Sequence, residues 1–351
     1  MVRESLGEMR LEALLVTDLN NIRYLSGFTG SSAVLLIGPD EAFFLTDSRY
    51  AGQAGGEVHR GFSVRVYRKK WLEEASGIIE RLKYRAVGFE GLSLSYDASV
   101  RIRKALKKAR LRNSGRPVNR VREVKDLYEL GLIRDAVKVL DRGYARAEGL
   151  IRPGAVEKDA AFSIEIFMRR RGADALAFDT IIASGERGAL AHGKASSKAI
   201  RKGELVVVDM GVRRKGYNSD ETRTVSAGSP SRRLRKIYMT VLEAQMKAIE
   251  KIAPGVKASS VDRAAREHIR KAGFGKFFGH ALGHGVGLEV HEGPFIGPES
   301  SDILREGMVF TVEPGIYVPG RAGVRIEDMV LVTARGSEVL TKAPKEAFSI
   351  I

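Results

Sequence analysis

The first third of the chain alternates short apolar blocks with amphipathic segments, a pattern typical of a mixed α/β domain. Three apolar blocks, EALLVTD, SAVLLIG and EAFFLTD, predict strands. Apolar positions at helical spacing predict helices near residues 48–56, 71–83 and 97–110. The segment NSGRPVN then contains Gly and Pro and predicts a linker, so we place the first domain at residues 1–118.

The second part, residues 119–351, mixes long helices with hairpins. Its first segment, VKDLYELGLIRDAVKVLDRGYARAEGLI, has the apolar period of a long amphipathic helix that stops at RPG. Three further helices are predicted near residues 157–171, 231–252 and 259–272. Strands are predicted near residues 179–183 and 205–225, and in GVGLEVHE, MVFTVEP and VRIEDMVLVT. Helices intermixed with antiparallel hairpins predict an α+β fold.

Two of the predicted hairpins carry acidic residues among apolar neighbours. A hairpin in VVVDMGVRRKGYNSDETRTV, centred on RRKG, sets Asp209 directly opposite Asp220, with Cβ atoms roughly 4.5–5.5 Å apart. A hairpin in FTVEPGIYVPGRAGVRIED, centred on Gly320, pairs Glu313 with Glu327 in the same way. Buried carboxylates this close repel, so one of each pair is protonated or a cation lies between them. The matched pairs also indicate an internal structural duplication.

Three histidines lie between these hairpins, in GHALGHGVGLEVHEGP: His280, His284 and His291. Four carboxylates with at least one imidazole and no thiolate suit Mn, Co, Fe or Zn. Four anionic ligands exceed the need of one divalent ion, whereas two ions about 3.5–4 Å apart can share them and activate a bridging water. The segment lacks the second histidine of HExxH and the GK[ST] of a phosphate loop, and the chain offers no nucleophile elbow. From the residues alone we infer a two-metal hydrolase.

Composition narrows the class of protein further. The 351 residues are 44% hydrophobic and 29% charged, as in an ordinary soluble globular protein. The chain has no cysteine, which excludes disulfides and thiolate metal sites and favours a cytoplasmic location. Its first residues make a poor signal peptide, and no apolar run approaches the roughly 20 residues that span a bilayer. Five Asn and two Gln beside abundant Lys, Arg and Glu are typical of proteins that work at high temperature.

The net charge of +16 leaves a second function open. A basic surface can bind nucleic acid or another acidic partner. The densest basic block, RIRKALKKARLRNSGRPVNRVREVK, has apolar residues at helical spacing, so much of its charge is expected on a solvated helix face. A non-catalytic protein that binds nucleic acid or an acidic partner is therefore the alternative to the hydrolase.

These motifs resemble those of the creatinase/methionine-aminopeptidase ("pita-bread") metallopeptidase family, and most of all its Xaa-Pro dipeptidases (prolidases) and Xaa-Pro aminopeptidases. NIRYLSGFTGSSAVLLI and FFLTDSRY resemble the creatinase-like N-terminal domain. SGERGALAHGKAS, the two acidic hairpins and GHGVGLEVHE resemble successive motifs of the catalytic domain. The resemblance implies a pita-bread catalytic domain at 119–351 behind a smaller α/β domain at 1–118. It also implies hydrolysis of Xaa-Pro bonds by a hydroxide that bridges two metal ions.

By this resemblance five residues bind the two ions: Asp209, Asp220, His284, Glu313 and Glu327. Asp220 and Glu327 would bridge the ions, and Glu313 would also handle the proton of the bridging hydroxide. His192 in ALAHG and His291 in EVHE match histidines that the family uses around the substrate and the tetrahedral intermediate. His280 matches a less defined position and could support the site.

Proline sets the demands on the substrate pocket. An Xaa-Pro bond has no N–H and populates cis and trans isomers, so a pocket shaped for the pyrrolidine ring would supply specificity. Candidate walls are Phe178, Tyr217 and Phe295, together with Ile181.

The chain departs from the family's pattern in two places. The frequent PHG is AHG here, with Ala191 before His192. Some prolidases carry an arginine soon after HE to hold a dipeptide carboxylate, whereas this chain has Phe295 and then a distant Arg305. The second departure weakens the case for a strict dipeptidase and leaves room for an aminopeptidase acting on longer peptides.

The resemblance also implies a homodimer. In the related families the N-terminal domain packs against a partner subunit and restricts access to the catalytic cleft. A methionine aminopeptidase would lack this extra domain, and a metal-free creatinase-like enzyme would have lost ligands that this chain keeps.

Overall fold

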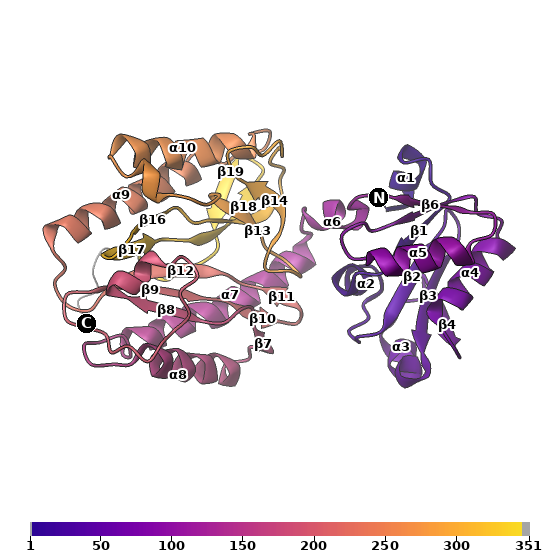
Figure 1. The fold of residues 1–351 in the computed structure, drawn as a ribbon, viewed down its shortest axis with the longest axis horizontal. Helices are drawn as coiled ribbons and strands as arrows, with labels where there is room; N and C mark the ends of the chain where they lie inside the picture. The colour runs from indigo at the N-terminus through magenta and orange to yellow at the C-terminus, as the bar shows by residue number, and fades with distance from the viewer. Residues whose placement is uncertain (1, 346–351) are drawn as a thin grey trace. The chain divides into compact units, whose positions relative to one another are not determined.

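A computed structural model describes residues 2–345, and its contacts divide the chain into two compact units, Met1–Arg122 and Glu123–Ile351 (Figure 1). The domain boundary predicted after residue 118 falls inside helix α6 (Pro117–Arg122), which begins with the proline that suits a first helical turn. Val118 of this helix is buried in the core of the first unit. Within residues 2–345, no helix combines the length and apolar character that crossing a bilayer requires.

The first unit is a six-stranded mixed sheet in the order β4-β3-β2-β1-β5-β6, with helices on both faces. Its strands are β1 (Ala13–Val16), β2 (Ala33–Ile37), β3 (Ala42–Asp47), β4 (Ser63–Tyr67), β5 (Ala86–Phe89) and β6 (Arg110–Asn113). One face packs on α1 (Val2–Glu8), α2 (Leu19–Ser26), α3 (Ala51–Glu57) and α6, and the other on α4 (Trp71–Arg81) and α5 (Tyr96–Ala105). A 3₁₀ turn, η1 (Ser48–Tyr50), precedes α3.

The strands and helices predicted for this unit are confirmed, apart from the length of one helix. The central strands β1 to β3 are buried almost throughout, as expected for continuous apolar runs covered on both faces. The helix predicted at 97–110 ends at Ala105 because the chain continues into the edge strand β6. Its basic residues Arg101, Arg103 and Lys104 are exposed, as predicted for a solvated face.

The second unit has two helix pairs on the outside and sheets between them (Figure 1). The helices are α7 (Leu127–Glu148), α8 (Glu157–Arg170), α9 (Arg232–Ile249) and α10 (Ala258–Lys271), with 3₁₀ turns η2 (Gly185–Ala189) and η3 (Gly275–Phe277). The first pair packs on β8 (Ile181–Ser184), β9 (Leu205–Met210) and β12 (Glu221–Ser226). The second pair packs on β15 (Val309–Val312), β16 (Gly315–Val318), β17 (Ala322–Arg325) and β18 (Asp328–Thr333).

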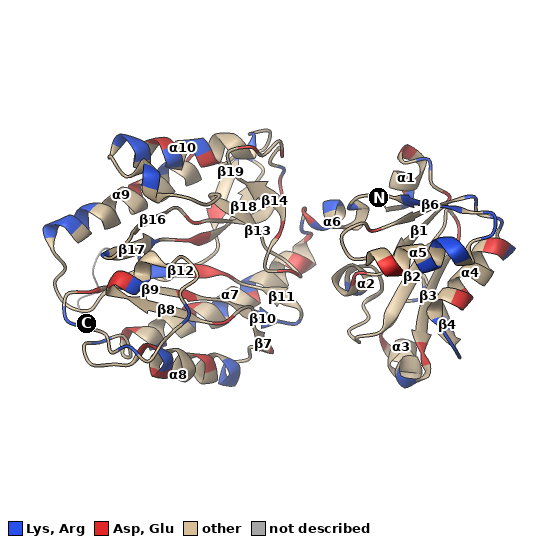
Figure 2. Cartoon of the chain, in the orientation of Figure 1, with Lys and Arg blue, Asp and Glu red and all other residues tan. Residues whose placement is uncertain are grey.

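Shorter strands complete the sheets: β7 (Ala175–Leu176), β10 (Val212–Arg214), β11 (Tyr217–Asn218), β13 (Gly283–Gly285), β14 (Glu292–Ile296) and β19 (Gly336–Val339). The sheet orders are β11-β10-β7, β12-β9-β8, β14-β13-β15-β18-β19 and β16-β17. Two apolar cores therefore lie against the two helix pairs. Polar side chains of β9 and β12 meet those of β17 and the following residues between the two halves. Figure 2 shows Lys and Arg along the outer helices α8, α9 and α10.

The register of the first acidic hairpin differs from the prediction by two residues. Asp209 pairs with Thr222, not with Asp220. The chain reverses at Lys215 and Gly216, which have φ of 49° and 91°, because a tight hairpin turn needs positive φ at both central residues and glycine adopts it freely. A shift by an even number keeps the same side chains on one face, so Asp209 and Asp220 become diagonal neighbours instead of a direct pair.

The register predicted for the second hairpin is confirmed. Val312 pairs with Asp328 in β15–β18, and Gly315 pairs with Arg325 in β16–β17, so the intervening Glu313 and Glu327 face each other. Both glutamates lie between strands, Glu313 before β16 and Glu327 before β18. The chain turns around Gly320, which has φ of 67°.

The strand predicted for GVGLEVHE is wrong. Residues 286–291 form an irregular loop between β13 and β14. The Gly287 oxygen accepts from the Asn218 backbone N–H at 2.8 Å, and the Asn218 side-chain amide donates to the oxygens of Gly287 and Leu288 at 3.0 Å, so Asn218 replaces a regular strand ladder here. The apolar alternation of this segment reflects burial of Val286 and Leu288 in a loop.

Candidate metal centre

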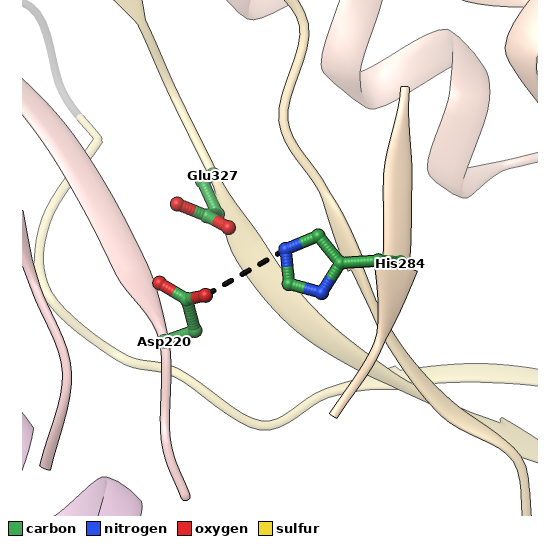
Figure 3. Close-up of side chains that lie close together, drawn as sticks. All are labelled: Asp220, His284 and Glu327. Atoms are coloured by element: carbon green, nitrogen blue, oxygen red, sulfur yellow. Dashed lines mark ion pairs between the residues drawn. The ribbon is translucent and has the colours of Figure 1, made fainter. Parts of the chain in front are cut away.

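Three of the predicted ligands converge between the two halves of the second unit (Figure 3). Asp220 precedes β12, His284 lies in β13, and Glu327 lies between β17 and β18. One ligand atom from each lies within 4.8 Å of the others. Asp220 and Glu327 are only 4% and 2% exposed, and His284 Nε2 is 3.7 Å from Asp220 Oδ2. Segments distant in the sequence thus meet in one small buried group of oxygen and nitrogen donors.

The other two predicted ligands adjoin this group in different ways. Glu313 Oε1 lies 3.3 Å from His284 Nε2. Asp209 Oδ2 accepts a hydrogen bond of 2.6 Å from Arg325 Nη2. Among the described residues, the second Asp209 oxygen, Oδ1, is buried without a hydrogen-bond partner. A buried carboxylate oxygen left in this way favours a further cation as its partner.

The charges of this group are far from balanced. Burial, reinforced by neighbouring carboxylates, raises the pKa of Asp220 and of Glu327 well above the ordinary range. Burial also raises the pKa of Glu313 to about 7 and lowers that of His284 to about 4, so the imidazole is neutral at neutral pH. A neutral imidazole with hard carboxylate oxygens is a suitable donor set for divalent Mn, Co, Fe or Zn, whose charge would offset the acids. The residues present therefore fit a divalent metal site.

Two threonines that the sequence analysis missed orient the acids. Thr222 Oγ1 donates to Glu327 Oε2 at 2.6 Å, and Thr311 Oγ1 donates to Glu313 Oε1 at 3.1 Å. Thr222 lies two positions after Asp220 along the chain, and Thr311 lies two positions before Glu313. Because alternate residues of an extended chain share one face, this spacing is a signal that could have identified both.

Arg325 was missed too, although it lies two positions before Glu327. Its guanidinium binds Asp209 and also donates from Nη1 to the Tyr317 hydroxyl at 2.9 Å. The Tyr317 hydroxyl is 3.0 Å from His280 Nε2, and burial lowers the pKa of His280 to about 4. His280 therefore supports Tyr317 and Arg325 and lies one step away from the acids, as the sequence analysis allowed.

His291 lies next to the ligand group. Its ring centroid is 4.0 Å from that of His284. Besides the hydrogen bonds from Asn218, the loop that carries it is fixed by a buried ion pair of 2.8 Å between Lys125 Nζ and Glu292 Oε1. Burial lowers the pKa of His291, so this ring too is neutral at neutral pH.

His192 lies in an exposed turn that is fastened to the β16–β17 hairpin. The carbonyl oxygen of Ala191 accepts a hydrogen bond of 3.0 Å from Arg325 Nη1. Gly323 of β17 approaches η2 so closely that a Cβ there would lie 1.7 Å from the Gly188 oxygen. The arginine that binds Asp209 thus also holds the residue before His192.

The residues proposed as pocket walls differ in exposure. Phe295 is 50% exposed and is the β14 partner of His284, so it stands beside the ligand group. Phe178 is half-buried against Gly211. Tyr217 is buried, and its hydroxyl donates to Glu129 at 2.8 Å. The position of Phe295 suits a pocket wall, whereas Tyr217 is engaged with the first turn of α7.

Comparison with known proteins agrees with this architecture. Residues 131–334 match metallopeptidase family M24, and residues 1–124 match the creatinase/prolidase N-terminal domain. A structure titled Xaa-Pro dipeptidase from Bacillus anthracis superposes with a TM-score of 0.96 at 38% identity, covering 99% of this chain and 97% of that one. An X-Pro aminopeptidase from Thermotoga maritima superposes with a TM-score of 0.89 at 39% identity, covering 98% and 99%. The Xaa-Pro dipeptidase of Pyrococcus horikoshii is 38% identical over 98% of this chain and 96% of its own length.

The fold and the buried donor group thus define a metal-dependent peptidase with a pita-bread catalytic domain. The chain belongs to metallopeptidase family M24 and carries a creatinase/prolidase N-terminal domain. The relatives give no support to the nucleic-acid alternative.

Proposed function

We propose that this protein is an exopeptidase that hydrolyses Xaa-Pro peptide bonds. The observation that carries the proposal is the buried group of Asp220, His284 and Glu327, adjoined by Glu313 and Asp209, in a chain similar over its full length to Xaa-Pro dipeptidases. The same similarity extends to an X-Pro aminopeptidase, so it is compatible with both short and longer Xaa-Pro substrates.

The five acidic and imidazole side chains would hold two divalent ions, of which Mn, Co, Zn and Fe suit the donors: Asp209, Asp220, His284, Glu313 and Glu327. When bound, such ions supply Lewis acidity and an activated water. Two ions are proposed because four carboxylates set against Arg325 exceed the compensation that one divalent ion provides.

The chain's own residues supply the proton transfers and the hydrogen bonds. Glu313, whose Oε1 lies 3.3 Å from His284 Nε2, is the candidate group that takes a proton from water and passes it to the departing proline nitrogen. The neutral ring of His291, beside His284, can donate its N–H to the carbonyl oxygen as negative charge develops there. His192, fastened through Ala191 to Arg325, is the second candidate for this contact. None of these contacts needs an N–H at the scissile bond, which proline lacks.

The residues expected beside the C-terminal end of the substrate favour an aminopeptidase over a strict dipeptidase. Phe295 occupies the region after HE where some relatives hold a dipeptide carboxylate, and it is half-exposed. The nearest following arginine, Arg305, is engaged with Glu123 at 3.2 Å. Phe178 and Phe295 are the proposed walls for the proline ring, and Tyr217 is the less suitable one because its hydroxyl binds Glu129.

Three further features belong to the proposal. We expect a homodimer, and a gel-filtration mass near that of a 38.5 kDa monomer at micromolar concentration would contradict it. The absence of cysteine fits a cytoplasmic location. The low content of Asn and Gln fits a source that grows at high temperature.

The test is hydrolysis of Met-Pro and of a longer X-Pro-X peptide after Mn²⁺, Co²⁺ or Zn²⁺ is added to metal-stripped protein. Asp220→Asn serves as the control that keeps the shape but removes a ligand charge. Release of the N-terminal residue from the longer peptide would establish an aminopeptidase, and cleavage of the dipeptide alone a prolidase. Absence of metal-dependent cleavage of either peptide would contradict the proposal.

A further inference from the structure

A second, largely buried polar group lies behind the candidate metal centre, on the opposite face of the segments that carry Asp220 and Glu327. We call it the rear cluster: Glu221, Arg223, Gln245, Asp328, Thr341 and Lys345. Glu221 follows Asp220 in the chain and Asp328 follows Glu327, so strand alternation turns these two side chains away from the metal ligands. None of these residues takes part in the chemistry proposed above.

Arg223 links the two halves of the second unit at the ligands. β12, which carries it, and β18 belong to different sheets. Its Nη1 donates to the backbone oxygens of Thr222 at 3.0 Å and of Glu327 at 2.5 Å. A planar guanidinium can hold both carbonyls in one orientation, and these carbonyls belong to a candidate ligand and to the threonine that orients it.

Gln245 of α9 holds the backbone next to Glu313 and Glu327 in a similar way. Its Nε2 donates to the oxygens of Val312 and Ile326 at 3.1 and 3.2 Å. These residues directly precede Glu313 and Glu327. A single side-chain amide therefore holds the backbone that directly precedes both glutamates.

Asp328 orients both of these side chains. Its Oδ1 accepts from Arg223 Nη2 at 2.8 Å, and its Oδ2 accepts from Gln245 Nε2 at 3.0 Å. Residues 341–345 complete the arrangement, because Asp328 also accepts from Thr341 Oγ1 at 2.8 Å and from Lys345 Nζ at 2.6 Å. The Ala343 oxygen in this segment accepts two hydrogen bonds from Arg223.

We propose that Arg223 and Asp328 are positioning residues that set the spacing of the metal ligands, and that residues 341–345 fasten them from behind. The proposal rests on the proposed metal centre and extends it to residues that touch neither metal nor substrate. Ligand spacing governs the affinity and coordination geometry of a metal ion, so the rear cluster acts on metal binding and on turnover, not only on stability.

The test uses two pairs of matched variants of the full chain. Arg223→Lys removes the guanidinium whose Nη1 donates to the Thr222 and Glu327 oxygens. Arg214→Lys is its control, because Arg214 also donates from Nη1 to a backbone oxygen, that of Gly172, which is no part of the candidate metal centre. Lys345→Met removes one donor to Asp328, and Lys342→Met changes an exposed lysine of the same segment. Each metal-stripped protein is titrated with Co²⁺ alone and followed by visible absorption, which reports affinity and coordination geometry. The kcat and KM for an Xaa-Pro peptide and the Tm are then measured.

We expect Arg223→Lys to weaken Co²⁺ binding at least tenfold, to alter the absorption bands and to lower kcat more than it changes KM. Lys345→Met is expected to weaken binding about threefold, with both controls within twofold of the parent. If Arg223→Lys does not fold, Lys345→Met decides between the outcomes. Variants that bind Co²⁺ like the parent with unchanged bands, even at a lower Tm, would overturn the positioning role alone. A parent protein that binds no Co²⁺ would overturn the proposed metal centre and this inference with it.

Discussion

The segments around Asp220 and Glu327 present two faces that differ in how far their acids are balanced by cations. Toward the candidate metal centre, four carboxylates are set against Arg325: Asp209, Asp220, Glu313 and Glu327. Toward the rear cluster, the two acids Glu221 and Asp328 meet the two cations Arg223 and Lys345. Asp220 and Glu327 on one face are buried, as are Glu221 and Asp328 on the other, so the difference lies in charge compensation and not in exposure to water.

The carboxyl pKa values respond to this difference. Burial raises the pKa of Glu313 to about 7 and that of Glu327 well above its ordinary range, because neighbouring acids add to the cost of ionisation. Asp328 is equally buried, yet Arg223 and Lys345 lower its pKa. Glu221 is the exception at the rear, since burial outweighs Arg223 and raises its pKa to about 8. Buried acids without nearby cations indicate a site that binds a ligand, whereas buried acids paired with cations indicate a structural role.

The largest expected effect comes from Asp220→Asn on the metal-facing side. Loss of one ligand charge should reduce kcat/KM on the order of 10³-fold with saturating metal, since it removes several kcal/mol of stabilisation in the transition state. In the metal-free protein the same change should raise the unfolding free energy at pH 7, because the neutral amide relieves a buried, uncompensated carboxylate. Kinetics and chelator-treated denaturant unfolding measure the two effects. A large loss of stability in chelator would contradict the comparison.

Asp328→Asn should have the opposite effect on stability. It leaves Arg223 and Lys345 without their shared carboxylate in a buried setting, which costs about 3 kcal/mol of unfolding free energy. Asp135→Asn is the control, because its ion pair with Lys138 lies on the surface, and its loss should change stability by about 0.5 kcal/mol or less. Equal effects of the two changes on denaturant unfolding would refute the distinction between the faces.

The two faces should also respond oppositely to pH. The pKa of Glu313 is raised from 4.5 to about 7 in the folded state, so this group lowers stability progressively as the pH rises through that interval, by about 3 kcal/mol in total. The pKa of Asp328 is lowered, so its contribution is present above its ordinary pKa and is lost as the pH falls.

The histidines also make the stability of the protein depend on pH. Because the pKa of His284 is lowered in the folded state, its contribution to the unfolding free energy is lost as the pH falls. The contribution of Glu313 is therefore the difference in unfolding free energy between the parent and Glu313→Gln, measured in chelator from pH 4.5 to 7.5. We expect this difference to grow in favour of the glutamine variant as the pH rises, and to reverse when Mn²⁺ is added, because metal binding requires ionised ligands. A difference that does not vary with pH would refute the raised pKa.

The sequence predicted the fold and the proximity of the acids in the candidate site, because strand alternation strongly constrains which face of a hairpin an acid occupies. The pairing of Glu313 with Glu327 followed from the turn at Gly320 and is confirmed by the flanking pairs. The pairing of Asp209 with Asp220 was wrong by two residues, because the choice of turn depends on which residues tolerate positive φ, and Lys215 is an uncommon choice. Even so, the even shift kept both acids on one face.

Other features depended on contacts between distant segments, which a single sequence does not encode locally. Arg325 and Thr222 carried a usable signal, since each lies two positions from a predicted ligand. The hydrogen bonds from Asn218 that make residues 286–291 a loop carried none, because they join segments about 70 residues apart. The rear cluster was equally hidden, since it requires α9 and residues 341–345 to meet β12 and β18.

The variant with the smallest expected effect displaces the turn that carries His192 without changing any charge. Gly323→Ala introduces a Cβ that would lie 1.7 Å from the Gly188 oxygen, so η2 and the following turn with His192 must move away from β17. Because a displacement of about 1 Å at a substrate-contacting group can cost up to 10²-fold, we expect kcat/KM to fall roughly 10- to 100-fold. Bound Mn²⁺ should stay at the parent's level, since this turn carries no proposed ligand. Gly336→Ala is the control, because a Cβ there meets no atom within 4 Å. Loss of Mn²⁺ from Gly323→Ala would mean that the strain passes along β17 through Arg325 to Asp209, so that the acidic face depends on its packing as much as on its charge.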